Sequence, residues 1–164
     1  FNLMFNFKIE TYFKIIFIIS FVSIISAYFI EYILGYQPCN LCLIQRIPYV
    51  SSMALIITYY TFLKNQKFVI VLLTLIFIFS FFISFYHFGI EQGFFEESAV
   101  CSLKDTTNIL SKEDLLKQLN EKVVSCKDVT FRIFGLSLTS INMILSFIIT
   151  LKLIKIYSTH GKNK

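Results

Sequence analysis

The chain has 164 residues, of which 56% are hydrophobic and only 15% are charged. Soluble domains usually carry about 25% charged residues. A short chain also buries only part of its apolar surface, so a mean hydropathy of +0.72 argues against an ordinary soluble domain. The formal net charge of +5 does not indicate nucleic-acid binding, because no recognisable binding module accompanies it. The composition favours a membrane protein.

Four apolar runs are long enough to cross a bilayer as helices, which takes about 20 apolar residues each. We expect these helices at about 12–34, 44–63, 68–90 and 133–156. Backbone groups inside a bilayer have no water to bond with, so a spanning segment is either a helix or a strand of a closed barrel. The sequence shows no period-two alternation, which a barrel would require. The runs therefore predict an all-α four-transmembrane-helix bundle. We treat residues 1–164 as a single integral membrane domain.

The first run taken alone is also compatible with a secretory signal. It lacks a convincing small-x-small cleavage site, and the three later runs still require a bilayer. We therefore interpret it as the first membrane helix.

Lysines predict the orientation of the four helices. Lys8 and Lys14 precede the first run, a KNQK turn separates the second from the third, and further lysines follow the fourth. The positive-inside rule then places both termini and this turn in the cytoplasm. The segments at about 35–43 and 91–132 lie outside, and the longer one carries eight acidic and six basic residues.

All four cysteines fall in these two external segments. Cys39 and Cys42 form a C-x-x-C pair in the short segment, and Cys101 and Cys126 lie in the long one. Disulfides persist in oxidising compartments, and an even count on that side predicts disulfide chemistry. A C-x-x-C pair closes too small a loop to be a good staple and is typical of a bond that opens and closes.

Two other interpretations of the cysteines stay open at this point. Cys101 and Cys126 by themselves fit a structural disulfide, the usual role outside the cell. A zinc site with four cysteine ligands usually shows two close pairs, whereas the second pair here is widely separated. We expect no metal.

An arginine stands at the boundary of the second run. Arg46 follows Cys42 by four residues and so shares its helical face. The helix N-terminus and the nearby cation both favour a thiolate at Cys42, which would be a good electron donor to a bound acceptor. The alternative is an interfacial anchor, but an external arginine runs against the positive-inside trend, which favours function. Pro38 and Pro48 stiffen the corner that carries the pair.

Two further features lie near the external side. His87 is near the external end of the third run; a lone histidine in a helix is often structural, but histidines in membrane segments are rare and tend to mark proton paths. The stretch SKEDLLKQLNEKVV opens with Ser111 and has Asp114 three residues later, which predicts a capped amphipathic helix. This helix would lie on the membrane surface or pack on the rest of the loop.

Together these residues resemble the DsbB family, bacterial membrane thiol oxidases. The family shows C-x-x-C-x-x-x-R at the start of the second of four helices, as at Cys39 to Arg46. The stretches FYHFGIEQGFFE (85–96) and SCKDVTFRIFGLSLTSINMI (125–144) resemble the end of its third helix and the opening of its fourth. The cysteine order also matches, whereas the related vitamin K epoxide reductase family places its loop cysteines before its C-x-x-C.

The resemblance implies an electron relay through two disulfides. A reduced periplasmic thioredoxin-fold partner similar to DsbA would attack Cys101 of a Cys101–Cys126 disulfide and form a mixed disulfide. Thiol exchange would then carry the electrons to the Cys39–Cys42 pair, through a Cys39–Cys126 bridge. Exchange needs access and a good leaving thiol, which an exposed loop would supply.

The resemblance also implies a membrane quinone, ubiquinone or menaquinone, as the acceptor of electrons from Cys42. Arg46, His87 and Gln45 are the expected quinone-binding residues. Gln45 stands where several relatives have glutamate, which keeps hydrogen bonding but removes a charge. The implied location is the bacterial inner membrane, with the cysteines in the periplasm.

Three competing hypotheses come from other classes or families. The chain could be a non-catalytic membrane assembly protein with structural disulfides. It could also be a vitamin K epoxide reductase-like enzyme, which the cysteine order opposes. A transporter is disfavoured because the sequence shows no inverted repeat and no acid in the middle of a predicted membrane helix.

Overall fold

The computed structural model describes residues 2–62, 65–96, 101, 126–127, 132–133 and 135–162. Its elements, in chain order, are α1 (Asn2–Tyr32), α2 (Asn40–Ile44), α3 (Ile47–Thr61), α4 (Gln66–Glu91), β1 (Arg132–Ile133), β2 (Leu136–Ser137) and α7 (Leu138–Lys162). The amphipathic helix expected after Ser111 falls outside the described residues.

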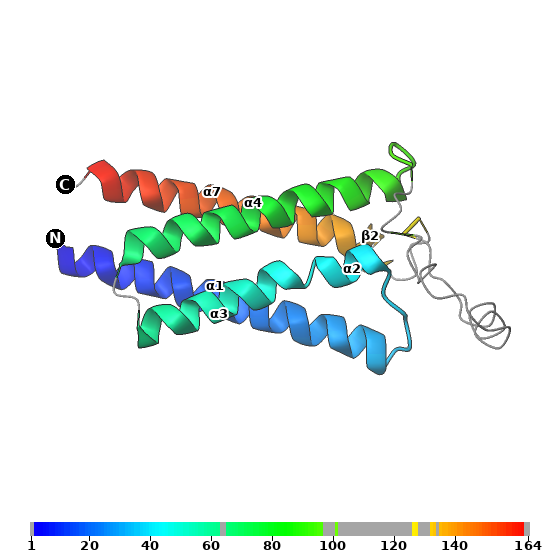
Figure 1. Ribbon diagram of the computed structural model, residues 1–164, viewed down its shortest axis with the longest axis horizontal. Coiled ribbons are helices and arrows are strands. Elements are labelled where there is room, and N and C mark those ends of the chain that lie inside the picture. Colours follow the sequence, from blue (N-terminus) through cyan, green and yellow to red (C-terminus); the bar gives the residue numbers. More distant parts are fainter. Residues whose placement is uncertain are drawn as a thin grey trace, which may run out of the picture.

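Four stretches are long and apolar enough to cross a membrane, which confirms the predicted all-α bundle. They are Ile9–Tyr32, Asn40–Thr61, Gln66–Glu91 and Leu138–Thr159. The long helices run side by side, with both chain ends and the turn between α3 and α4 at one end of the bundle (Figure 1). The other end carries α2 and the short hairpin of β1 and β2, and we call it the cysteine end. The chain is a multi-pass membrane protein with four spans.

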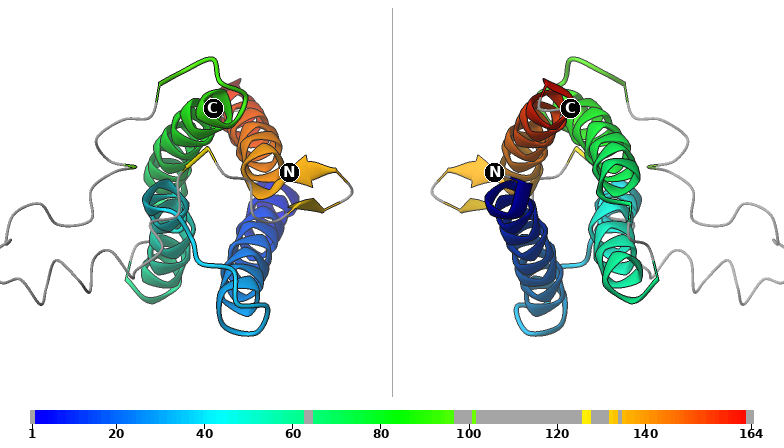
Figure 2. Two further views of the ribbon diagram at one scale, coloured as in Figure 1. Left: turned by 90° about the vertical axis from the view of Figure 1, so that its right-hand side faces the viewer. Right: turned by 90° about the vertical axis from the view of Figure 1, so that its left-hand side faces the viewer.

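The helices follow one another around the bundle in sequence order. Neighbouring contacts join α1 to α3, α3 to α4, and most extensively α4 to α7. Seen end-on, α1 and α7 lie on one side of an arch and α3 and α4 lie on the other (Figure 2). Residues from both sides can therefore face a common interior.

Apolar packing and paired hydroxyls hold the helices together. The bundle core includes Phe13, Phe77 and Leu153, each at most 1% exposed. Two buried hydroxyl pairs cross helix interfaces: Ser20 with Ser52 between α1 and α3, and Ser80 with Ser146 between α4 and α7, each at 2.9 Å. Lipid tails are as apolar as leucine, so close packing and such hydrogen bonds specify association in a bilayer.

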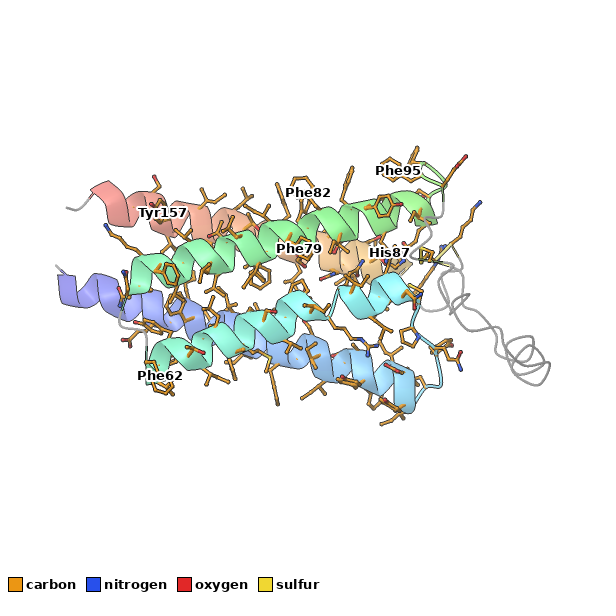
Figure 3. The ribbon with its side chains drawn as sticks, in the orientation of Figure 1. Phe62, Phe79, Phe82, His87, Phe95 and Tyr157 are labelled. Atoms are coloured by element: carbon orange, nitrogen blue, oxygen red, sulfur yellow. A yellow bond between two sulfur atoms is a disulfide. The ribbon has the colours of Figure 1, made fainter. Side chains whose placement is uncertain are left out.

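Large apolar side chains cover the outside of the bundle. Phe82 points outward from α4 (Figure 3), and about half of the surface of Phe79, Phe82 and Tyr157 is exposed, at 53%, 62% and 49%. This distribution is expected where the surrounding solvent is hydrocarbon rather than water.

The second membrane segment is broken near the cysteine end. A single helix was expected at about 44–63, but the structure has a short α2, a turn at Gln45 and Arg46, and then α3. Pro48 lies in the first turn of α3, where its missing N–H costs no helical hydrogen bond. Beyond the break, α2 continues α3 toward the cysteine end (Figure 1), and the two together form one membrane span.

The fourth long helix begins later than the 133–156 expected from the sequence. Before it, β1 and β2 pair as an antiparallel hairpin, with Arg132 opposite Ser137 and Ile133 opposite Leu136. Gly135 allows the turn because it adopts φ +82°, a conformation that residues with a side chain rarely adopt. Ser137 then accepts a hydrogen bond from the Ser140 N–H at 3.2 Å, and so caps α7.

Candidate redox site

The four cysteines meet at the cysteine end of the bundle. Cys101 and Cys126 form a disulfide with a Cα–Cα distance of 5.7 Å. Both belong to one buried apolar cluster with Cys39, and Cys42 packs against that cluster. The two sulfur pairs, distant in sequence, are therefore neighbours in space.

Cys39 caps the N-terminus of α2 with its sulfur. The Sγ atom accepts a hydrogen bond from the Cys42 N–H at 3.3 Å, lies 2.7 Å from the Cys42 Sγ, and lies 3.6 Å from the His87 Nε2. The hydrogen bond from the Cys42 thiol is the largest influence on the Cys39 thiol. Together with His87 it outweighs burial and lowers the pKa of Cys39 to about 5. The donors that stabilise a thiolate thus converge on Cys39, whereas the sequence analysis placed the thiolate at Cys42.

A chain of amides sets the orientation of the His87 ring. The Tyr49 hydroxyl donates to Asn142 Oδ1, and Asn142 Nδ2 donates to Gln45 Oε1 at 3.1 Å. Gln45 Nε2 therefore faces His87 Nδ1, at 2.9 Å, as a donor. With Nδ1 accepting, the ring carries its proton on Nε2, which points toward Cys39. Gln45 thus acts on the site through His87.

Glu91 belongs to this site, although the sequence analysis counted it among the loop acids. Its Oε2 accepts a hydrogen bond from Ser137 and its Oε1 accepts one from Thr139, both at 2.6 Å. Oε1 also lies 4.0 Å from His87 Nε2, and the side chain is 5% exposed. The i,i+4 spacing of His87 and Glu91 in one helix was the available signal, and it was missed because the helix was expected to end at 90.

Arg46 has partners on α1 that the sequence analysis also missed. Its Nη1 lies 2.6 Å from Glu31 Oε2, and its guanidinium lies over the Tyr28 ring at 5.0 Å from the ring centre. Both ion-pair partners are mostly buried, with side chains 16% and 22% exposed. The pairing offsets the cost of placing a guanidinium at the bilayer boundary. It also ties the end of α1 that lies at the cysteine end to the start of α3.

A pocket of about 350 Å³ lies inside the cysteine end. Apolar side chains from α1 and α7 form much of its wall, and its volume lies within the range of ordinary small-molecule sites. The predicted site residues that line it are Cys39, Cys42, Gln45, Arg46, His87 and Cys126. Cys101 is not among the lining residues. A flat apolar ring with polar oxygens, such as a quinone, fits this combination of apolar walls and a few polar groups.

The Cys39 and Cys42 sulfurs and a His87 ring nitrogen lie within 4.8 Å of one another, close enough to suggest a metal. Two thiolates on one zinc ion, with bonds of about 2.3 Å in tetrahedral geometry, would stand roughly 3.8 Å apart. The observed sulfur separation of 2.7 Å is much shorter and brings the pair close to the length of a disulfide, about 2.05 Å. We interpret the pair as redox-active and do not assign these residues as metal ligands.

Comparisons with known proteins agree with this arrangement. The family described as Disulfide bond formation protein DsbB matches residues 10–156. Uncharacterized protein RP370 of Rickettsia prowazekii (strain Madrid E) is 30% identical over 148 residues, covering 88% of this chain and 86% of that protein. No solved structure is significantly similar to the chain. The chain belongs to the DsbB family, which confirms the resemblance and implies thiol oxidoreductase activity.

We expect His87→Ala to raise the pKa of Cys39 from about 5, because the variant removes one of the groups that stabilise the thiolate. Loss of this hydrogen bond should move the titration by about one pH unit, which corresponds to about 1.4 kcal/mol. The pKa is measured from the ultraviolet absorbance of the thiolate as a function of pH. The protein used carries Cys101→Ser and Cys126→Ser, so that the loop cysteines do not contribute. The matched control is His160→Ala, at the other histidine of the chain. An unchanged midpoint in His87→Ala would contradict the assignment.

Proposed function

We propose that this member of the DsbB family is a quinone-dependent thiol–disulfide oxidoreductase that reoxidises a periplasmic DsbA-like thioredoxin-fold protein. The observation that carries the proposal is the shared pocket, which brings Cys39 and Cys42 together with Cys126, His87 and Arg46. The pocket lies within the membrane-spanning bundle, where a lipid-soluble two-electron acceptor is available. A water-soluble acceptor would not need a pocket inside the membrane-spanning bundle.

Electrons enter through the loop disulfide. A partner thiolate attacks Cys101, and the released Cys126 sulfur attacks Cys39, its neighbour in the buried cluster. Further exchange restores Cys101–Cys126 and leaves Cys39 and Cys42 reduced. Cys101 and Cys126 are only 3% and 2% exposed, so the residues that cover them have to move before a partner can attack. Access therefore depends on partner binding rather than on a permanently exposed sulfur.

Electrons leave through the pocket. When bound there, a quinone accepts two electrons and two protons. Cys42, freed when Cys126 bonds to Cys39, is the sulfur that we assign to this transfer. Arg46 stabilises negative charge that develops on the acceptor oxygen, a role suited to a fixed cation in a site of low dielectric constant. Gln45 and His87 orient the acceptor and the Cys39 sulfur.

The arrangement of the ends supports an inner-membrane orientation with the cysteines outside. Both chain ends and the turn next to Lys67 lie at the end opposite the cysteines (Figure 1). The positive-inside rule assigns that end to the cytoplasm. The cysteine end then faces the periplasm, where disulfides persist.

We expect purified protein in detergent to reduce ubiquinone or menaquinone when it is supplied with a reduced DsbA-like partner. Cys42→Ser and Cys101→Ser should each lower turnover to background, because each breaks one of the two disulfides in series. Quinone absorbance in the ultraviolet follows the reaction. Turnover that persists in Cys101→Ser would remove the loop disulfide from the path. Failure of the wild type with both quinones would favour the structural-disulfide hypothesis.

Charge changes at the Arg46–Glu31 pair test the quinone site. Glu31→Gln leaves Arg46 free to face the pocket and should lower the KM for quinone. Glu31→Gln/Arg46→Gln removes both charges without leaving one buried alone, and should raise the KM about tenfold above the wild type, or about 1.4 kcal/mol. Arg132→Gln, at an exposed arginine in β1, is the control. A double variant with the wild-type KM would show that Arg46 does not serve the acceptor.

A further inference from the structure

Glu91 is a buried carboxylate at the external end of α4 whose role the proposed relay leaves open. Its side chain is 5% exposed, and it lines the same pocket as Cys39 and Cys42. Burying a carboxylate at the edge of the bilayer is costly, and such residues are usually retained for function.

Both carboxylate oxygens of Glu91 accept hydrogen bonds from the start of α7. Ser137 and Thr139 each use their single hydroxyl proton to donate to one of its two oxygens, at 2.6 Å in both cases. An ionised carboxylate is an acceptor only, so it satisfies both donors at once. Ser137 precedes α7 and Thr139 lies in its first turn, so the start of α7 holds the carboxylate against α4.

His87 does not serve as the proton acceptor in this geometry. Its Nδ1 accepts a hydrogen bond from Gln45, and its Nε2 already carries a proton that points toward Cys39. Besides His87, Glu91 and the two cysteines of the C-x-x-C pair, the described titratable residues that line the pocket are Tyr36, Arg46, Tyr49 and the disulfide-bonded Cys126. A guanidinium only donates hydrogen bonds, and a neutral phenol is a much weaker base than a carboxylate. The Cys39 thiolate accepts the hydrogen bond of the Cys42 thiol, but it is the sulfur that forms the new S–S bond and so cannot keep the proton. The carboxylate Oε1, 4.0 Å from His87 Nε2, is the base that remains.

We propose that Glu91 accepts the thiol proton of Cys42 as the Cys39–Cys42 disulfide forms, and then gives that proton to the reduced quinone. This inference rests on the proposed function. In this step the S–S bond forms, the S–H bond of Cys42 breaks, and the electron pair passes to the quinone. One of the two protons needed for quinol comes from Glu91. The second proton comes from external water. Cys39 is a thiolate before the step, because its proton has already gone to that water.

The experiment isolates the step in which the dithiol reduces quinone. Protein with reduced Cys39 and Cys42 is mixed with a short-chain ubiquinone in a stopped-flow instrument, and quinone absorbance is followed. Glu91→Gln keeps the size of the side chain but removes the base, and should slow this step about 100-fold, the scale of general acid–base catalysis. Glu91→Asp keeps a carboxylate and should recover most of the rate. Glu96→Gln, at an exposed acid in the same segment, should match the wild type.

A second measurement separates proton transfer from a folding defect. Without quinone, a reduced DsbA-like partner should reduce Cys101–Cys126 in Glu91→Gln within about twofold of the wild-type rate, because this step precedes the one assigned to Glu91. Equal slowing of both steps, or a wild-type quinone step in Glu91→Gln, would overturn the role of Glu91. A wild-type protein that does not reduce quinone would instead overturn the proposed function itself.

Discussion

The contact between the Cys39 sulfur and His87 Nε2 is the interaction around which the site is built. It requires the N-terminal cap of α2, which is Cys39, to lie beside His87 of α4. It also requires the His87 ring to present its protonated nitrogen, which depends on Gln45 after α2 and on Asn142 in α7. The stability of a thiolate at Cys39 therefore depends on the packing of α2, α4 and α7 against one another.

Charged side chains are destabilising near a bilayer, and in this site each one has a hydrogen-bonding or ionic partner. Arg46 is matched by Glu31, and Glu91 by two hydroxyls from the start of α7. The first pair joins α1 to the start of α3, and the Glu91 contacts join α4 to α7, from which it is separated by more than 40 residues. These contacts also join the helices around the pocket, so a substitution at one partner is expected to disturb both charge and packing.

The sequence predicted those features that depend on the local spacing of residue types along the chain. Hydropathy predicted the four spans, and the C-x-x-C pair with Arg46 and His87 predicted residues that do line one pocket. Glu31 and Glu91 were not predicted, because an acid near the end of a helix is indistinguishable from a solvated one until its partners on other elements are known. The start of α7 at Leu138 was not predicted either, because the apolar run continues through the β1–β2 hairpin. That hairpin depends on the positive φ of Gly135. The family resemblance supplied the relay and the quinone, which spacing alone could not.

The most direct test of the account is whether electrons pass between the two cysteine pairs within the buried cluster. In a Cys42→Ser/Cys101→Ser variant, the remaining Cys39 and Cys126 sulfurs have lost their usual partners. The account predicts that they form a disulfide with each other under mild oxidation, detectable as a crosslinked peptide by mass spectrometry under non-reducing conditions. If both instead remain free thiols while the wild type forms its Cys101–Cys126 bond, the two pairs do not exchange and the relay is contradicted.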